Sequence, residues 1–188
     1  MMSSTHQLMA LLSAFWVLTQ YPVSVGPVMA VLAIVAVMVG ALTPDLDQPT
    51  ANVWRRVLGA RALGNIFQSF SGGHRHFTHS VIGILVVGYA LRWGIHHFLR
   101  PELIDEAMII WRAYMIGYIS HPIADTLTDN GVPWLWPLHI QIKVPPGPEE
   151  LRVTTDSIVE RVVVRGGVII SIVLIVRSHW DIFLNLFR

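Results

Sequence analysis

The sequence predicts an all-α integral membrane protein: a polytopic bundle of about five membrane helices with one further amphipathic helix at the interface. Its composition is the first reason, because 53% of the 188 residues are hydrophobic and only 13% are charged, against about 25% in soluble domains. The second reason is the stretch from residue 7 to residue 44, which contains no Asp, Glu, Lys, Arg or His. A bilayer span needs about 20 apolar residues, so this stretch is long enough for two helices. The length suits one domain over residues 1–188.

Tyr21-Pro22 divides the uncharged stretch, because proline disfavours helical structure in the residue before it. We expect a first helix over residues 5–20 and a second over residues 23–42, with Pro44 just beyond it. The first helix lacks the Lys/Arg region that begins a secretory signal, so we expect it to be retained.

A polar connection follows over residues 44–78. Its middle, NVWRRVLGARALGNIFQSF (52–70), places arginines among Val, Leu, Ile and Phe at helical spacing, which is typical of an interfacial amphipathic helix. A helix that covers the mouth of the bundle fits the same pattern.

Three more helices are expected in the second half of the chain, over residues 78–99, 104–125 and 158–176. Pro101 follows the first of them, and the long connection over residues 126–158 is rich in Pro and Trp. The last residues, HWDIFLNLFR, form an amphipathic tail that we expect at the surface.

Alternating crossings bring most of the notable histidines and carboxylates to one end of the bundle, which we call side A. The ends of five predicted helices meet there, and they carry His6, Asp45, Asp47, His74, His76, His79, His121, Asp125 and Glu160. Such groups at membrane depth are costly unless they are paired or bound to a metal, and they are usually functional. Because the chain has no cysteine, a metal would be held by imidazole and carboxylate, which suits zinc, manganese or iron.

Spacing supports a shared site. His121 and Asp125 are four residues apart and project from one helix face, although a metal-free hydrogen bond at a helix end has the same spacing. Asp45 and Asp47 follow a proline; one can face the site while the other orients a histidine or caps a helix, and a plain turn is the alternative. Arg75, between two histidines, can hold a phosphate by a bidentate contact.

Other polar residues keep two interpretations. His6 and His139 are either ligands or polar side chains near the membrane surface. Glu160 either serves the site or pairs with a neighbouring arginine.

Three segments together resemble the YdjM/YbcI family of bacterial inner-membrane proteins, described as predicted metal-dependent hydrolases: PDLDQ (44–48), HRHFTHS (74–80) and GYISHPIADTLTDNGVPWLWP (117–137). The resemblance extends from His6 to VTTDSIVERVV (153–163), which carries Glu160. It implies a set of metal ligands: His6, Asp45, His74, His79, His121 and Asp125. The family usually has glycine where this chain has His76, so His76 is not expected to be a ligand.

The family is more remotely similar to zinc-dependent phospholipase C and nuclease P1-type enzymes. Those enzymes also use Asp, then His, then a helical His-x-x-x-Asp, an order matched here by Asp45, His79, and His121 with Asp125. Their later His-x-x-x-Glu has no counterpart, because Glu160 lacks a histidine four residues earlier. The resemblance therefore implies a site for one or two metal ions.

These observations predict a membrane-bound, metal-dependent hydrolase that acts on a phosphoester of a lipid or lipid-linked substrate. A divalent metal, with zinc expected first, would activate water, and Asp47, Arg75 and Glu160 are the candidate catalytic residues. A lipid ester or amide is the nearest variant, and a metal transporter or a non-catalytic metal-binding protein is the main alternative. A membrane scaffold is a third class. The net charge of +1 and the lack of a basic run give no reason to expect a nucleic acid partner.

The distribution of basic residues predicts that side A faces the cytoplasm, because cytoplasmic loops carry an excess of Lys and Arg. Side A has Arg55, Arg56, Arg61, Arg75, Lys143, Arg152, Arg161 and Arg165, and the opposite side has Arg92, Arg100, Arg177 and Arg188. We therefore expect a multi-pass bacterial inner-membrane protein with its site on the cytoplasmic side.

Overall fold

The computed structural model describes residues 1–47, 77–138 and 140–186. Within these ranges the chain is helical and forms no β-sheet; its only β-type pairings are two isolated bridges, Thr128 with Val153 and Val132 with Ile142. The longer helices are α1 (Ser3–Gln20), α2 (Gly26–Gly40), α5 (Val81–Phe98), α6 (Ile104–Thr126), α7 (Arg165–Ser178) and α8 (Trp180–Asn185). The short helical turns are η1 (Pro44–Asp47), η2 (Phe77–His79), η3 (Pro101–Leu103), η4 (Glu149–Leu151) and the π-helical η5 (Val159–Val164).

The predicted helices are confirmed, with differences at their ends. Helix α5 begins at Val81, because Ser80 caps it by accepting a hydrogen bond from the Gly83 N–H at 3.0 Å. The predicted single helix over residues 158–176 begins instead with the π turn η5 and continues as α7. The amphipathic helix expected over residues 52–70 lies outside the described residues.

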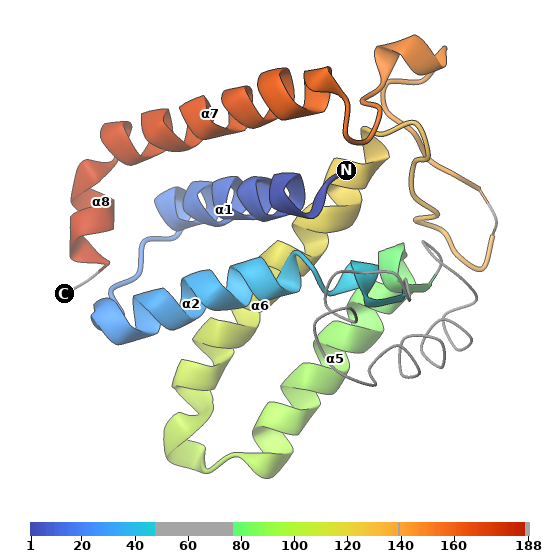
Figure 1. Cartoon of the computed structure of the whole chain (residues 1–188). Coiled ribbons are helices and arrows are strands. Elements are labelled where there is room, and N and C mark those ends of the chain that lie inside the picture. Colours follow the sequence, from blue (N-terminus) through green and yellow to red (C-terminus); the bar gives the residue numbers. More distant parts are fainter. Residues whose placement is uncertain (48–76, 139, 187–188) are drawn as a thin grey trace, which may run out of the picture.

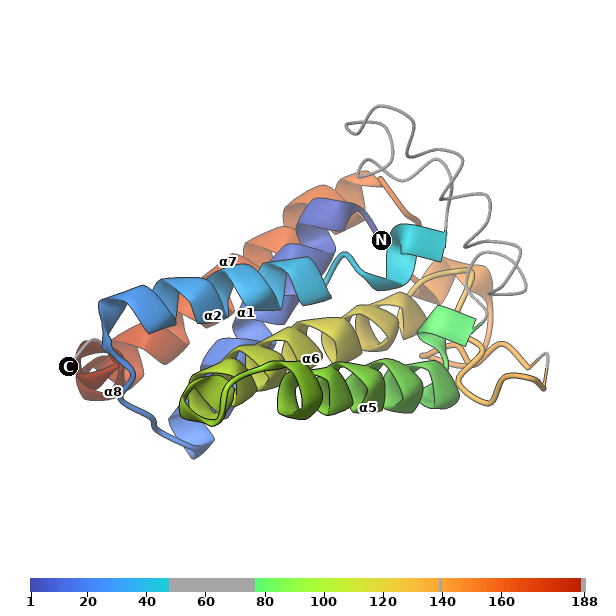
Figure 2. The ribbon, with the colours of Figure 1, turned by 90° about the horizontal axis from the view of Figure 1, so that it is seen from below.

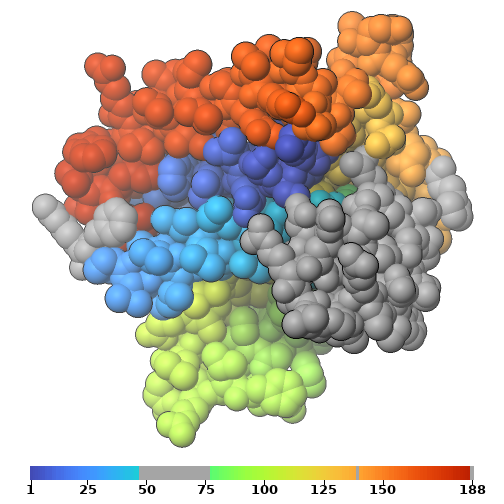
Figure 3. Space-filling view, in the orientation of Figure 1, coloured from blue at the N-terminus to red at the C-terminus, as the bar shows by residue number. Residues whose placement is uncertain are grey.

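Helix α1 lies between α7 and α2, and α6 crosses behind them (Figures 1 and 3). Helix α6 contacts α1, α2 and α5, so it is the central helix of the bundle. Figure 2 shows α5 running beside α6. The start of α1, the turns η1 and η2, the end of α6 and the turn η5 all lie at one end of the molecule, which is the predicted side A (Figure 1).

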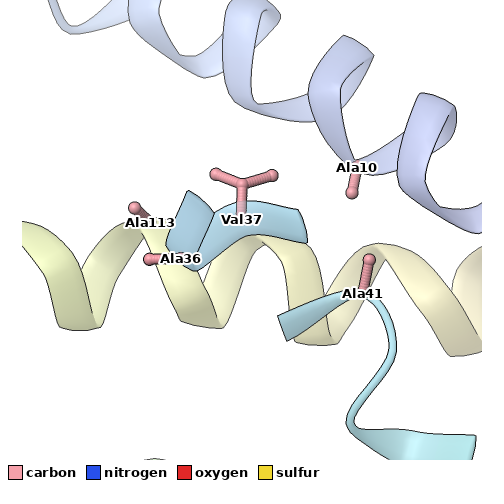
Figure 4. Close-up of a cluster of buried hydrophobic side chains, with 5 residues drawn as sticks. All are labelled: Ala10, Ala36, Val37, Ala41 and Ala113. Carbon is pink, nitrogen blue, oxygen red and sulfur yellow. The ribbon is translucent and has the colours of Figure 1, made fainter. Parts of the chain in front are cut away.

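Small side chains let the central helices approach closely. The buried cluster between α1, α2 and α6 consists of four alanines and a valine: Ala10, Ala36, Val37, Ala41 and Ala113 (Figure 4). A Cβ atom on Gly40 would overlap the Tyr114 carbonyl, and one on Gly117 would overlap the Val37 carbonyl. Close backbone contact through small residues is typical of helices that associate in membranes.

A bundle of about five membrane helices is not confirmed. Among the described helices, only Val81–Phe98 is both long and apolar enough to cross a membrane. Helices α2 and α7 have 15 and 14 residues, short of the about 20 that a span needs, and α6 carries Asp105, Glu106, Arg112 and Asp125. Large apolar side chains are nevertheless exposed along α2, α5 and α7: Val28, Val31, Val35, Leu85, Val86, Tyr89, Ile170, Val173 and Leu174.

Candidate metal site

Five of the predicted ligands come together at side A. His6 lies in the first turns of α1, Asp45 in η1, His79 at the end of η2, and His121 and Asp125 near the end of α6. The predicted convergence is therefore confirmed for these five residues. His74 and Arg75, and the alternatives His76 and His139, lie outside the described residues, as does the side chain of Asp47.

The first triad is formed by His79, His121 and Asp125. The Nε2 atoms of the two histidines are 3.3 Å apart. Asp125 Oδ2 lies 3.6 Å from His121 Nε2 and 3.9 Å from His79 Nε2. Zinc binds imidazole nitrogen at about 2.0–2.1 Å, so two ligands of a tetrahedral site are about 3.3–3.4 Å apart. The two nitrogens have this separation, and the carboxylate would need to move by only a few tenths of an ångström.

A second triad, of His6, Asp45 and His121, overlaps the first. Asp45 Oδ1 lies 3.5 Å from His121 Nε2 and 4.0 Å from His79 Nε2. The rings of His6 and His121 stack with centroids 3.6 Å apart, and His6 Nε2 lies 3.2 Å from Asp125 Oδ1. Because His121 Nε2 belongs to both triads, the described residues fit one cation most directly, and a second cation would need further ligands.

Hydrogen bonds on the outer side of two rings turn their Nε2 atoms inward. His121 Nδ1 lies 2.6 Å from the Ala41 carbonyl oxygen, an acceptor, so in the neutral ring Nδ1 carries the proton and Nε2 keeps its lone pair. His79 Nδ1 lies 3.0 Å from the Thr78 hydroxyl. Such outer partners fix ring orientation in metal sites. Among the described residues, no hydrogen-bond partner faces the buried Nδ1 of His6.

Four members of the cluster are closed off from solvent, and the fifth is not. His6, His79, His121 and Asp125 are at most 1% exposed, whereas the Asp45 side chain is 23% exposed. Burial by itself raises the pKa of Asp45, but the hydrogen bond with His121 and the neighbouring imidazoles outweigh it and lower the pKa below its usual value. Asp45 is therefore a carboxylate at neutral pH, on the open side of the cluster.

Polar residues that the sequence did not single out hold η2 against α6. The Tyr118 hydroxyl donates to the Thr78 carbonyl at 2.8 Å. The Trp134 carbonyl accepts the Val81 N–H at 3.0 Å, while its indole N–H donates to the Thr126 hydroxyl at 2.9 Å. These bonds fix His79 relative to the end of α6. A useful sequence signal was the spacing of Tyr118 three residues before His121, which places both on one helix face.

Glu160 is buried but belongs to neither triad. Its Oε1 accepts the Met2 N–H and its Oε2 accepts the Asp156 N–H, each at 2.7 Å. Asp125 Oδ1 also accepts a hydrogen bond from the Met1 amine at 2.7 Å. The start of α1 is thus tied both to the cluster and to Glu160.

Comparison with known proteins identifies relatives that are inner membrane proteins. Residues 1–182 match the family described as YdjM inner membrane protein. The chain is similar to the inner membrane protein YdjM of Escherichia coli, with 30% identity over 55% of this chain and 48% of that protein. It is 30% identical to the uncharacterized protein YvsG of Bacillus subtilis over 68% of each chain. The E. coli inner membrane protein YbcI is 34% identical over 47% of each.

The matched part spans about half the length of the two E. coli proteins. No solved structure matches the chain.

Proposed function

The chain belongs to the YdjM inner membrane protein family, and from this membership and the geometry of side A we propose that it is a membrane-bound, metal-dependent hydrolase. The observation that carries the proposal is the arrangement of His79, His121 and Asp125. Their donor atoms face one another at 3.3–3.9 Å while fully buried. These separations are close to the about 3.3–3.4 Å between two ligands of a tetrahedral divalent cation.

The donor set of nitrogen and oxygen suits zinc first, with manganese or iron as alternatives. A cation held by His79, His121 and Asp125 would polarise a phosphoryl or acyl oxygen and would lower the pKa of bound water. Asp45 is the member nearest to solvent, so we place the substrate on its side of the cluster. Arg75 and Asp47 stay as predicted catalytic residues, with Arg75 expected to hold a phosphate.

A groove on the same face of α6 supports a lipid or lipid-linked substrate. This groove, which we call the α2–α5–α6 groove, has a volume of about 500 Å³ and an almost wholly apolar lining: Leu32, Val35, Ala36, Val39, Leu91, Ile95, Ala107, Ile110, Trp111 and Tyr114. Its α6 residues lie seven to fourteen positions before His121, which corresponds to about 10–21 Å along the helix. One leaflet of a bilayer is about 15 Å deep in hydrocarbon, so an acyl chain could follow the groove while its headgroup lies at the cluster.

We further propose the multi-pass arrangement, with about five membrane helices and side A facing the cytoplasm. The exposed apolar side chains along α2, α5 and α7 support contact with lipid. The cytoplasmic placement rests on the excess of basic residues at side A.

A non-catalytic metal-binding protein, or a metal transporter, is the second candidate. The observation that favours it is the near-complete closure of the cluster, since four of its five members are at most 1% exposed. Structural metal sites are closed, whereas catalytic sites keep an open position.

The test begins with metal analysis of the detergent-solubilised full chain, where we expect bound zinc, manganese or iron. Asp125→Asn should weaken cation binding by more than the about 10–100-fold that loss of an outer partner costs, and it should abolish hydrolysis of phospholipid substrates. Asp105→Asn is the matched control, because Asp105 is exposed in the first turn of the same helix.

Bound metal without turnover on phosphoester, carboxylic ester or amide lipids would favour the non-catalytic candidate. Loss of metal flux in Asp125→Asn proteoliposomes would favour a transporter. A wild-type chain that binds no divalent cation would overturn the proposal.

A further inference from the structure

We propose that Glu160 is a positioning residue, which fixes the first turn of α1 and thereby holds His6 in the metal site. This inference rests on the metal site proposed above. Glu160 would then act through His6 and not by contact with a substrate.

Glu160 contacts the start of α1. Met2 is the residue that precedes α1, and no side chain of α1 itself caps this end. The Glu160 carboxylate accepts the Met2 N–H at 2.7 Å. The first N–H groups of a helix lack partners within it, and a negative charge near them is favourable because of the helix dipole. Glu160 therefore serves as an external cap for α1.

Arg165, at the junction of η5 and α7, also contacts the start of α1. Arg165 Nε donates to the Thr5 hydroxyl at 3.0 Å, and its Nη2 lies 2.7 Å from the Met2 sulfur. The Thr5 side chain also lies beside the Glu160 carboxylate. Thr5 directly precedes His6, so Glu160 contacts the backbone and Arg165 contacts the side chains of the turn that carries His6.

The π turn of η5 sets the directions in which Glu160 and Arg165 point. The Arg165 N–H bonds to the Glu160 carbonyl, five residues earlier, which is the hydrogen-bond pattern of a π-helix. In a regular α-helix, residues five apart point about 140° away from each other. The π turn instead brings Glu160 and Arg165 to the same side, where both face α1. Single π turns inside helices are frequent at functional sites.

Helix α1 is linked to the cluster through His6. His6 Nε2 lies 3.2 Å from Asp125 Oδ1, and the His6 ring stacks on His121. A displacement of the first turn of α1 would therefore move an imidazole out of the site while leaving the triad on α6 and η2 in place.

The experiment measures cobalt(II) as a spectroscopic probe in the detergent-solubilised full chain, with the variants Glu160→Ala, Glu160→Gln, His6→Ala and the double variant. Glu160→Ala should weaken cobalt binding by about 10–100-fold, as for other outer partners of metal ligands. Its visible spectrum should change to that of His6→Ala. The double variant should bind no more weakly than His6→Ala alone, because both changes remove one interaction. Glu160→Gln keeps one acceptor oxygen and should give an intermediate affinity.

Arg161→Gln is the matched control, since Arg161 lies in η5 but makes only an exposed ion pair with Asp156, with both side chains 54% exposed. It should leave affinity and spectrum unchanged. A second measurement needs no metal: hydrogen exchange of residues 1–10 should quicken in Glu160→Ala and not in Arg161→Gln.

Three results would overturn the inference. The first is additive losses of affinity in the double variant. The second is a loss of lipid turnover in Glu160→Ala at wild-type cobalt affinity and spectrum, which would make Glu160 catalytic. The third is unchanged exchange of residues 1–10. If the wild-type chain binds no cobalt, the metal site fails, and the exchange measurement still decides whether Glu160 positions α1.

Discussion

Gly117→Ala should separate α6 from α2 at the metal site. A Cβ atom at this position would overlap the carbonyl oxygen of Val37, a backbone atom that cannot move aside independently of α2. The same close approach allows His121 Nδ1 to reach the Ala41 carbonyl at 2.6 Å. The substitution therefore strains the helix contact and stretches the hydrogen bond that orients a proposed ligand.

The magnitude follows from three contributions. Overpacking a close contact costs about 1–3 kcal/mol. Leaving the buried Ala41 carbonyl without its partner costs about 1–3 kcal/mol more. Alanine regains roughly 0.8–1 kcal/mol over glycine through its helix propensity. The net loss is about 3 kcal/mol, which for a chain of this length lowers the melting temperature by about 6–12 °C.

Thermal unfolding in detergent and cation titration measure the two effects. Gly167→Ala is the matched control, because a Cβ atom at this exposed position on α7 would meet nothing within 4 Å. We expect Gly167→Ala to keep the wild-type affinity and to keep or slightly raise the melting temperature. A Gly117→Ala protein with wild-type melting temperature and cation affinity would refute the reasoning.

Three further predictions concern the site and its groove. Tyr118→Phe removes the hydroxyl that donates to the Thr78 carbonyl; we expect about 1–3 kcal/mol lower stability and weaker cation binding by titration, neither of which the exposed-site variant Tyr89→Phe should show. Ile110→Trp should block the α2–α5–α6 groove and reduce turnover of long-chain lipids but not of short soluble analogues. The control Val17→Trp lies in the groove between α1, α6 and α7 and should leave both activities unchanged. Unaffected lipid turnover in Ile110→Trp would remove the groove from the proposal. Cation affinity should fall as the pH is lowered, because protons compete with the metal for the imidazole nitrogens; an affinity that stays flat from neutral to acidic pH would contradict histidine ligation.

The sequence was sufficient to predict the longer helices of the described residues and the meeting of five of the six predicted ligands. Proline positions and uncharged runs mark where helices end, and successive crossings then dictate which ends share a side. His121 and Asp125 needed only the helical repeat, because residues four apart face the same way. The distance between His79 and His121, which are 42 positions apart, could be predicted only as a shared end of the bundle.

What the sequence could not supply were the contacts that depend on exact helix rotation. The π turn of η5 has no marker in VERVVV, so Glu160 and Arg165 were not expected to face the same neighbour. Nothing in the sequence distinguishes Gly117, which packs against the Val37 carbonyl, from other helical glycines. Glu160 was predicted either to serve the site or to pair with a neighbouring arginine, whereas its position beside α1 depends on that unpredicted turn.

Because the side chains of the core are small, the polar cluster is important for holding the helices together. Lipid removes most of the hydrophobic drive for helix association, so close packing and polar contacts must hold membrane helices together. The core between α1, α2 and α6 contains four alanines and one valine, and such side chains offer little apolar area. At side A, in contrast, α1, η1, η2 and α6 each contribute a ligand to one cluster. A cation bound by His79, His121 and Asp125 would crosslink η2 to α6, with His6 of α1 and Asp45 of η1 next to it, so its binding and the association of these helix ends are coupled. Removal of the cation should therefore loosen side A before the alanine-lined middle of the bundle.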